Sequence, residues 1–168
     1  MTQSAEDRWA LFDLVARFDD AVNRRDAKEF ATLWADDAVW NIGEPMPMQA
    51  QGKDNIVRTW TQMIAGTQWL FRGSFAGVVS LDGERASGRW PCIETGVFAD
   101  GQGYDNRSTY EDEYVCRQGR WLFLHRHYRY LWLSSQPLPG GSDIGATNRR
   151  HRLVLQVADM TVSLSLAR

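Results

Sequence analysis

The sequence is poor in the residues that bind metals and form disulfides. It has only two cysteines, Cys92 and Cys116, and three histidines, His125, His127 and His151. The cysteines lack the close spacing of a metal site, and we expect two small, buried or half-buried thiols. The histidines give at most one paired site and no facial triad, so we predict that the protein binds no metal.

Several other signals are missing. No run of about 18 apolar residues is present, and the N-terminal MTQSAEDRW lacks the basic and then apolar order of a signal peptide, so we expect a cytoplasmic protein without a membrane segment. The net charge of -2 shows no basic excess that would favour nucleic acid. No phosphate loop, dinucleotide fingerprint or nucleophile elbow occurs, and we predict no bound cofactor.

Aromatic residues, by contrast, are abundant: eight Trp, seven Phe and five Tyr in 168 residues. So many rings either fill a core or line a pocket for flat organic ligands, and both readings stay open. The length suits one compact domain that buries roughly two thirds of its unfolded surface. We assign 1–133 to this domain, and 134–168 to a loop and a tail that pack on it or on a neighbouring subunit.

The first half of the chain predicts three helices. Residues 5–24 repeat apolar side chains with helical spacing, a second helix starts after Asp26 and carries Phe30, Leu33 and Trp34, and a third spans the stripe from Ile56 to Ile64. A short strand over 38–42 and a proline-containing loop over 43–47 lie between the second and third helices.

The second half predicts strands. Runs over 69–81 and 85–98 flank Asp82-Gly83, a strong hairpin signal, and runs over 104–116 and 121–133 form a second hairpin around Gly119. Helices followed by strands indicate an α+β fold, with three helices packed in a curved antiparallel sheet. The alternating tail, 153–166, is expected to add an edge strand or to cross to another subunit.

Strand alternation places polar groups on shared faces of this sheet. Tyr110 falls with Asp112, and Arg126 falls with Tyr128 and Tyr130. Such groups are costly on one face unless that face lines a polar cavity or meets water. Arg126 would then bind an anionic ligand group, stabilise an oxyanion, or hold an acidic side chain in an ion pair.

Glu94 is the first candidate for a catalytic base. It shares a strand face with Trp90 and Cys92, and a carboxylate among tryptophan rings would have its pKa raised by desolvation. The alternative is a solvent-facing glutamate at a strand end. His127 is predicted to lie on the opposite face from Arg126, but a β-bulge would turn it inward, so it stays a reserve candidate.

Four stretches together resemble the SnoaL-like branch of the nuclear transport factor 2-like superfamily. They are FDDAVNRRDAKEFATLWADDAVW (18–40), Gly52-Lys53-Asp54, LDGERASG (81–88) and EDEYVCRQGRWLFLHRHYR (111–129). The resemblance implies a cone-shaped α+β barrel that hosts dehydratases, dehydrohalogenases, isomerases, other cofactor-free lyases and binding proteins.

The resemblance also implies an Asp on the first helix paired with a His on the first long strand. The matching positions here are Asn23 and Phe71, with Arg72 next to Phe71. Neither Asn nor Phe exchanges protons at neutral pH, so a base must come from elsewhere. Asn23 would instead hydrogen-bond a substrate oxygen or end the helix.

The leading hypothesis is a cofactor-independent lyase or isomerase that acts on an aromatic or polycyclic small molecule. Dehydration, cyclisation or isomerisation of the ring system, and carbon-carbon cleavage that releases a small aldehyde stay open, and elimination is favoured. Glu94 would take the proton, and Arg126, Tyr110, Tyr128 and Asn23 would steady the developing oxyanion. The apolar lining is predicted at Trp40, Trp60, Phe71, Trp90 and Phe18. Rival hypotheses are a non-catalytic small-molecule-binding module and a subunit of a larger oxygenase. Because the helices cover one sheet face only, we expect a homodimer or homotrimer.

Overall fold

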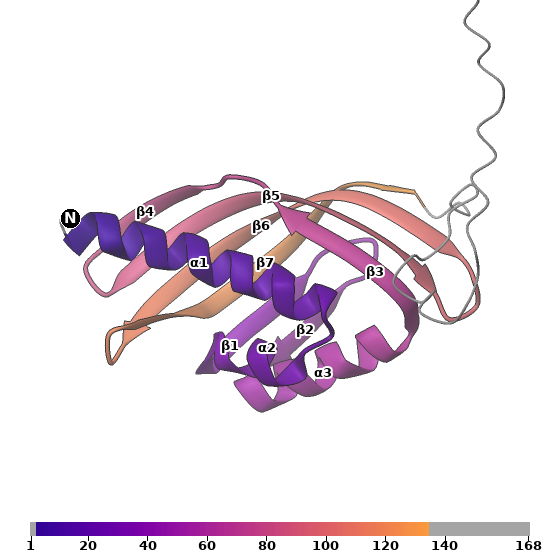
Figure 1. The fold of residues 1–168 in the computed structure, drawn as a ribbon, viewed down its shortest axis with the longest axis horizontal. Helices are drawn as coiled ribbons and strands as arrows, with labels where there is room; N and C mark the ends of the chain where they lie inside the picture. The colour runs from indigo at the N-terminus through magenta and orange to yellow at the C-terminus, as the bar shows by residue number, and fades with distance from the viewer. Residues whose placement is uncertain (1–2, 135–168) are drawn as a thin grey trace, which may run out of the picture.

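The computed structural model describes residues 3–134, and its helices pack inside a curved sheet (Figure 1). The helices are α1 (Gln3–Asn23), α2 (Ala27–Thr32) and α3 (Lys53–Ala65). The side chain of Asp26 caps α2 by accepting from the backbone amides of Lys28 and Glu29. The second helix was predicted to reach Trp34, but it ends at Thr32 because Trp34 already begins the first strand.

The strands form one seven-stranded sheet in the order β2-β1-β7-β6-β5-β3, with β4 paired to β5. They are β1 (Trp34–Ile42), β2 (Met48–Gln51), β3 (Thr67–Ser74), β4 (Val78–Asp82), β5 (Arg85–Phe98), β6 (Gly103–Arg117) and β7 (Arg120–Ser134). All neighbouring strands are antiparallel except β1 and β7, which are parallel. The predicted α+β fold is confirmed, and so are both predicted hairpins.

Two strand predictions were wrong. The run over 69–81 is not one strand, because β3 stops at Ser74 and β4 starts at Val78. At Gly77 an added Cβ would lie 2.5 Å from the carbonyl oxygen of Arg89, so the backbone here is held close to β5. The short edge strand β2 was missed, because the sequence pattern assigned no element to residues 48–51 and four residues carry little periodicity.

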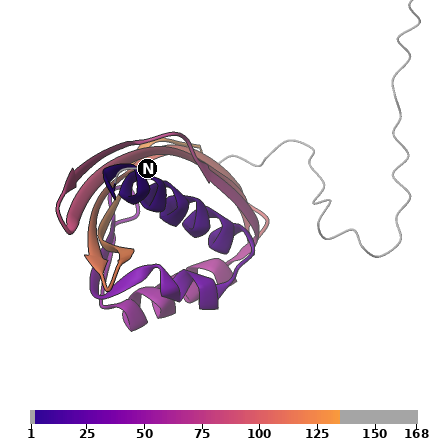
Figure 2. The ribbon, with the colours of Figure 1, turned by 60° about the vertical axis from the view of Figure 1, so that its left-hand side comes forward.

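The sheet curves around α1, while α2 and α3 close its open side (Figure 2). At the end where α1 begins, the interior is filled by side chains. The buried residues there include Leu11, Leu14, Val15, Trp90, Tyr114, Trp121 and Phe123. Among the described residues, no helix is both long and apolar enough to cross a membrane. The predicted tail lies outside the described residues.

Candidate functional site

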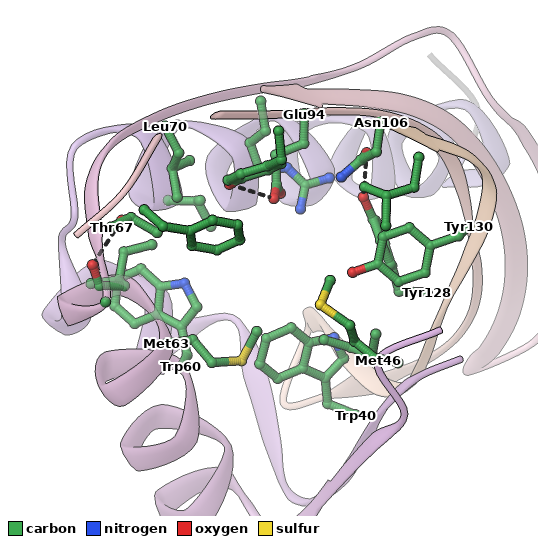
Figure 3. Close-up of a pocket in the computed structure, with 18 of the residues that line it drawn as sticks. Trp40, Met46, Trp60, Met63, Thr67, Leu70, Glu94, Asn106, Tyr128 and Tyr130 are labelled. Atoms are coloured by element: carbon green, nitrogen blue, oxygen red, sulfur yellow. Dashed lines mark hydrogen bonds between the residues drawn. The ribbon is translucent and has the colours of Figure 1, made fainter. Parts of the chain in front are cut away.

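A cavity of about 410 Å³ opens at the end of the cone opposite the filled core. Helices α1 and α3 and strands β1, β3, β5, β6 and β7 contribute to its wall. Its lining residues include Phe18, Trp40, Trp60, Arg72, Glu94, Tyr104, Asn106, Tyr110, Tyr128 and Tyr130. Figure 3 shows Glu94 and Asn106 on one wall and Trp40, Trp60 and Met63 on the facing wall.

Glu94 faces this cavity from β5 and is half-buried. The hydroxyl of Tyr104 donates to Glu94 Oε1 at 3.0 Å. Burial raises the pKa of the Glu94 carboxyl, while nearby Arg72 and the Tyr104 hydrogen bond partly oppose that rise. A carboxyl of this kind is suited to accept a proton closer to neutral pH than an exposed glutamate.

Arg72 is the residue that sequence reasoning missed. It lies directly opposite Glu94 on the paired strands β3 and β5, so the two side chains leave the sheet on one face. Its Nε lies 2.8 Å from Asp19 Oδ1 on α1, and its Nη1 donates to the Tyr110 hydroxyl at 3.4 Å. The Arg72 side chain is only 2% exposed. The sequence did offer a signal for this placement. Arg72 is two residues after Leu70 in a strand, so both side chains lie on one face, and Leu70 also lines the cavity.

Arg126 does not line the cavity. It is fully buried and forms two hydrogen bonds with Asp112, at 2.9 and 3.1 Å. Its guanidinium carbon lies 3.7 to 4.1 Å from the ring centroids of Phe18, Tyr110 and Phe123. Arg126 lies on the inner face of the sheet, as predicted. It was wrongly expected to reach the cavity, because it lies in the filled part of the interior. Of the roles considered for it, the structure supports the ion pair with an acidic side chain.

The positions expected to replace the family's acid/base pair also lie outside the cavity wall. The Asn23 side chain donates to the Arg72 carbonyl oxygen at 2.9 Å and accepts from the Arg72 amide at 2.8 Å. Phe71 is 52% exposed because its neighbours Leu70 and Arg72 take the inward face. Helix α1 and strand β3 are nevertheless joined by an ion pair, which is formed by Asp19 and Arg72.

One more predicted lining residue, Trp90, lies outside the cavity wall, and the reserve candidate His127 lies on the opposite face, as alternation predicts. Trp90 is buried in the filled end, where its Nε1 donates to the Tyr114 hydroxyl at 2.6 Å. His127 is half-buried and does not line the cavity, because Arg126 and Tyr128 on either side of it are the buried positions of β7. The predictions that placed Phe18, Trp40, Trp60, Tyr110 and Tyr128 in the cavity wall agree with the structure.

The phenol groups of the wall are hydrogen-bond donors and poor bases. The Tyr128 hydroxyl donates to Asn106 Oδ1 at 2.8 Å and accepts from the Ser108 hydroxyl at 2.7 Å. Burial is the main cause that raises the pKa of Tyr104, Tyr128 and Tyr130, and the charge of Glu94 adds to the rise. These phenols therefore stay protonated near neutral pH.

Within residues 3–134 no group of three His, Cys, Asp or Glu side chains is placed to hold a metal ion. Cys92 is buried and Cys116 is half-buried. Cys92 lies against the Ser108 hydroxyl at 3.2 Å, and burial raises the pKa of its thiol. Among the described residues, the cavity wall therefore offers the Glu94 carboxyl, the Arg72 guanidinium, the Asn106 amide, several protonated phenols and apolar rings.

The chain is similar to a known protein family and to several solved structures. The family model described as "SnoaL-like domain" matches residues 3–127. A search of curated protein sequences finds no match. Among solved structures, the LinA-type3 hexachlorocyclohexane dehydrochlorinase of Novosphingobium barchaimii is similar, with 20% identity and a TM-score of 0.73, covering 84% of this chain and 96% of that chain.

Two further structures share the fold. LinA itself has 22% identity and a TM-score of 0.73, covering 82% of this chain and 92% of that one. A Novosphingobium aromaticivorans protein proposed to be a scytalone dehydratase has 14% identity and a TM-score of 0.72, covering 83% and 97% of the two chains. At these identities the likeness establishes the common fold and nothing finer.

Proposed function

This chain belongs to the SnoaL-like domain family, and from that premise we propose that it is a cofactor-independent lyase or isomerase acting on an aromatic small molecule. The single observation that carries the proposal is Glu94, a half-buried carboxyl that faces a ring-lined cavity. The proposal is also supported by two proteins of the same fold, a dehydrochlorinase and a proposed dehydratase, because both names denote elimination reactions.

In the proposed reaction Glu94 takes a proton from a carbon or a hydroxyl group of the substrate. Its Oε1 is held by the Tyr104 hydroxyl, which leaves Oε2 for the substrate. Burial raises the pKa of this carboxyl, and a base works best when its pKa approaches the working pH. Elimination is favoured, because an aromatic ring can spread the developing charge and lessen what the protein must stabilise.

The negative charge that develops on the substrate would be met by the groups beside Glu94. Arg72 takes the part that the sequence suggested for Arg126, since it lies opposite Glu94 and its positive charge is buried at the wall. The hydroxyls of Tyr110 and Tyr130 are the phenols available to donate, because Tyr128 already donates to Asn106 and Tyr104 to Glu94. Donors placed where charge develops lower the barrier.

A binding module without chemistry is the second candidate function. It is favoured by the two positions that match the family's acid/base pair, because the Asn23 amide is bound to backbone and Phe71 points outward. Under this hypothesis Glu94 recognises a ligand but moves no proton. The two functions differ in what they predict for turnover.

The test is a screen for turnover with a matched pair of variants. Aromatic compounds that carry an acidic hydrogen next to a hydroxyl or halide leaving group are incubated with the wild type, Glu94→Gln and Glu113→Gln, and products are detected by mass spectrometry. Glu113 is exposed on β6 and serves as the control. We expect Glu94→Gln to lose about 10²- to 10⁴-fold in kcat, the usual contribution of a general base.

Folding of each variant is checked by circular dichroism before rates are compared. A folded Glu94→Gln protein with full turnover would contradict the role of Glu94. Ligand binding without turnover of any compound would favour the binding module.

A further inference from the structure

The inner face of the sheet carries a set of charges that does not balance. Asp19 is paired with Arg72 at 2.8 Å, and Asp112 is paired with Arg126 at 2.9 Å. Within residues 3–134 Glu94 forms no ion pair with either arginine. When Glu94 is ionised, this cluster therefore has one negative charge left over, and that charge faces the cavity.

Aromatic rings surround this carboxylate. The Tyr104 hydroxyl touches it, and the Phe98 ring stacks on Tyr104 with centroids 4.8 Å apart. The rings that line the same cavity are Phe18, Trp40, Trp60, Phe98, Tyr104, Tyr110, Tyr128 and Tyr130. The faces of such rings carry partial negative charge and attract cations, most strongly where water is excluded.

We propose that the cavity selects organic cations, so that its ligand is an aromatic molecule carrying a protonated amine or a quaternary nitrogen beside Glu94. The carboxylate would meet the positive charge directly, and the surrounding rings would hold the rest of the group. The cation also removes the cost of keeping an uncompensated carboxylate in a ring-lined cavity.

Arg72 does not cancel this selection. Its guanidinium lies against Asp19 and is 2% exposed, whereas Glu94 is half-buried and accessible from the cavity. Both side chains line the cavity, but within residues 3–134 only Arg72 has an ion-pair partner, so the unpaired charge is that of the carboxylate. An anion in the same place would lie against the Glu94 carboxylate, and Arg72, whose charge is already paired with Asp19, would offset only part of that repulsion.

This inference deepens the proposed function and rests on it only for turnover. A positive nitrogen makes hydrogens on the adjacent carbon more acidic, which would assist a proton transfer to Glu94. Binding of the cation, however, is expected whether or not a reaction follows. The two proposals can therefore fail separately.

The experiment compares three probes of nearly equal size by isothermal titration calorimetry. They are phenethylamine as the cation, phenethyl alcohol as its neutral isostere and hydrocinnamate as the anion. We expect the wild type to bind the cation about tenfold to a hundredfold more tightly than the alcohol, the range for a charge-assisted contact. Glu94→Gln is expected to bind the cation and the alcohol alike, while Glu113→Gln keeps the preference.

Titration of Glu94 gives a second readout. The groups that face it are Arg72 on β3, Asp19 on α1, Tyr104 on β6, and Tyr128 and Tyr130 on β7. Burial raises the pKa of Glu94, so affinity for the quaternary probe phenethyltrimethylammonium should rise as the pH increases through that pKa. In Glu94→Gln this rise should be absent.

A cation affinity no greater than that of the alcohol, including no measurable binding of either, would overturn the proposal. Tighter binding of hydrocinnamate would overturn it as well. Loss of turnover in Glu94→Gln together with equal binding of all three probes would leave the catalytic proposal intact and remove this one.

Discussion

Glu94 is the residue at which function and stability oppose each other. Its carboxyl is held at a cavity wall by one hydrogen bond from Tyr104, and burial raises its pKa. The folded state therefore prefers the protonated form more than the unfolded chain does. The stability gained by protonation is present at low pH and is lost as the pH rises from the ordinary glutamate pKa through the raised one.

A prediction at this scale follows for Glu94→Gln. The neutral amide keeps an oxygen for the Tyr104 hydroxyl and removes the buried charge, so the variant should be more stable than the wild type near neutral pH. We expect a melting temperature higher by about 2–4 °C, the shift that 1 kcal/mol gives in a chain of this size. The measurement is thermal unfolding by circular dichroism at about pH 4, where glutamate is largely protonated, and about pH 8.

The difference between the two proteins should shrink at the lower pH. A wild type that is more stable than Glu94→Gln at both pH values would mean that the carboxylate stabilises the fold. Glu113→Gln, which changes an exposed carboxylate, should leave the melting temperature nearly unchanged at both.

For individual side chains, the sequence predicted the face of the sheet but not the position along the cone. Alternation correctly turned Glu94, Tyr110 and Tyr128 to the inner face, because a strand has a period of two. Alternation says nothing about position along the cone, and so Arg126 and Trp90 were assigned to the cavity although they lie in the filled part of the interior.

Among the elements, strands β3, β5 and β6 hold Glu94 beside Arg72 and Tyr104. Gly96 on β5 sits where a Cβ would lie 2.8 Å from the Trp69 carbonyl oxygen and 2.8 Å from the Tyr104 ring. A side chain at this position would have to push both β3 and Tyr104 aside. The glycine therefore allows the Tyr104 ring to reach Glu94.

Gly96→Ala is accordingly expected to destabilise the protein by about 1–3 kcal/mol, as overpacking usually does, and to weaken ligand binding. Gly73→Ala on β3 is the matched control, because an added Cβ there meets nothing within 4 Å. Chemical denaturation and calorimetric titration of the same ligand measure the two effects. Equal behaviour of both variants would show that the Gly96 contact is unimportant.

Element boundaries were predicted well where the signal is local. Asp82-Gly83 and Gly119 identified both hairpins, and the structure has positive φ at Gly83 and Gly119. Boundaries failed where distant contacts decide them. Trp34 completes a helical stripe in the sequence, yet it pairs with Phe123 of β7 in the sheet. No local pattern announces that partner.

At the scale of the whole molecule, no helix within residues 3–134 covers the outer face of the sheet (Figure 2). The exposed apolar side chains of this face include Phe71, Leu131 and Trp132. Trp132 additionally has the guanidinium of Arg107 over its ring at 5.6 Å. Exposed apolar groups on an uncovered sheet face are typical of association surfaces, and a homodimer or homotrimer remains our prediction.

Trp132→Glu should therefore shift the protein from the oligomer to the monomer. The charge would have to be buried without a partner if the outer faces meet. Trp9→Glu is the control, because Trp9 is 73% exposed and lies on helix α1 and not on the sheet. Light scattering coupled to gel filtration gives the mass, and a wild type that elutes as a monomer contradicts the prediction.

The division of the interior into a filled end and a hollow end has a consequence for how this protein can evolve. Packing around Leu11, Trp90 and Phe123 supports the fold at one end, and Met46 and Met63, each more than two fifths exposed, lie at the other. Substitutions at these methionines can reshape ligand preference while the packed end keeps the chain folded. We therefore expect single mutations at the hollow end to change which ligand binds without loss of the fold.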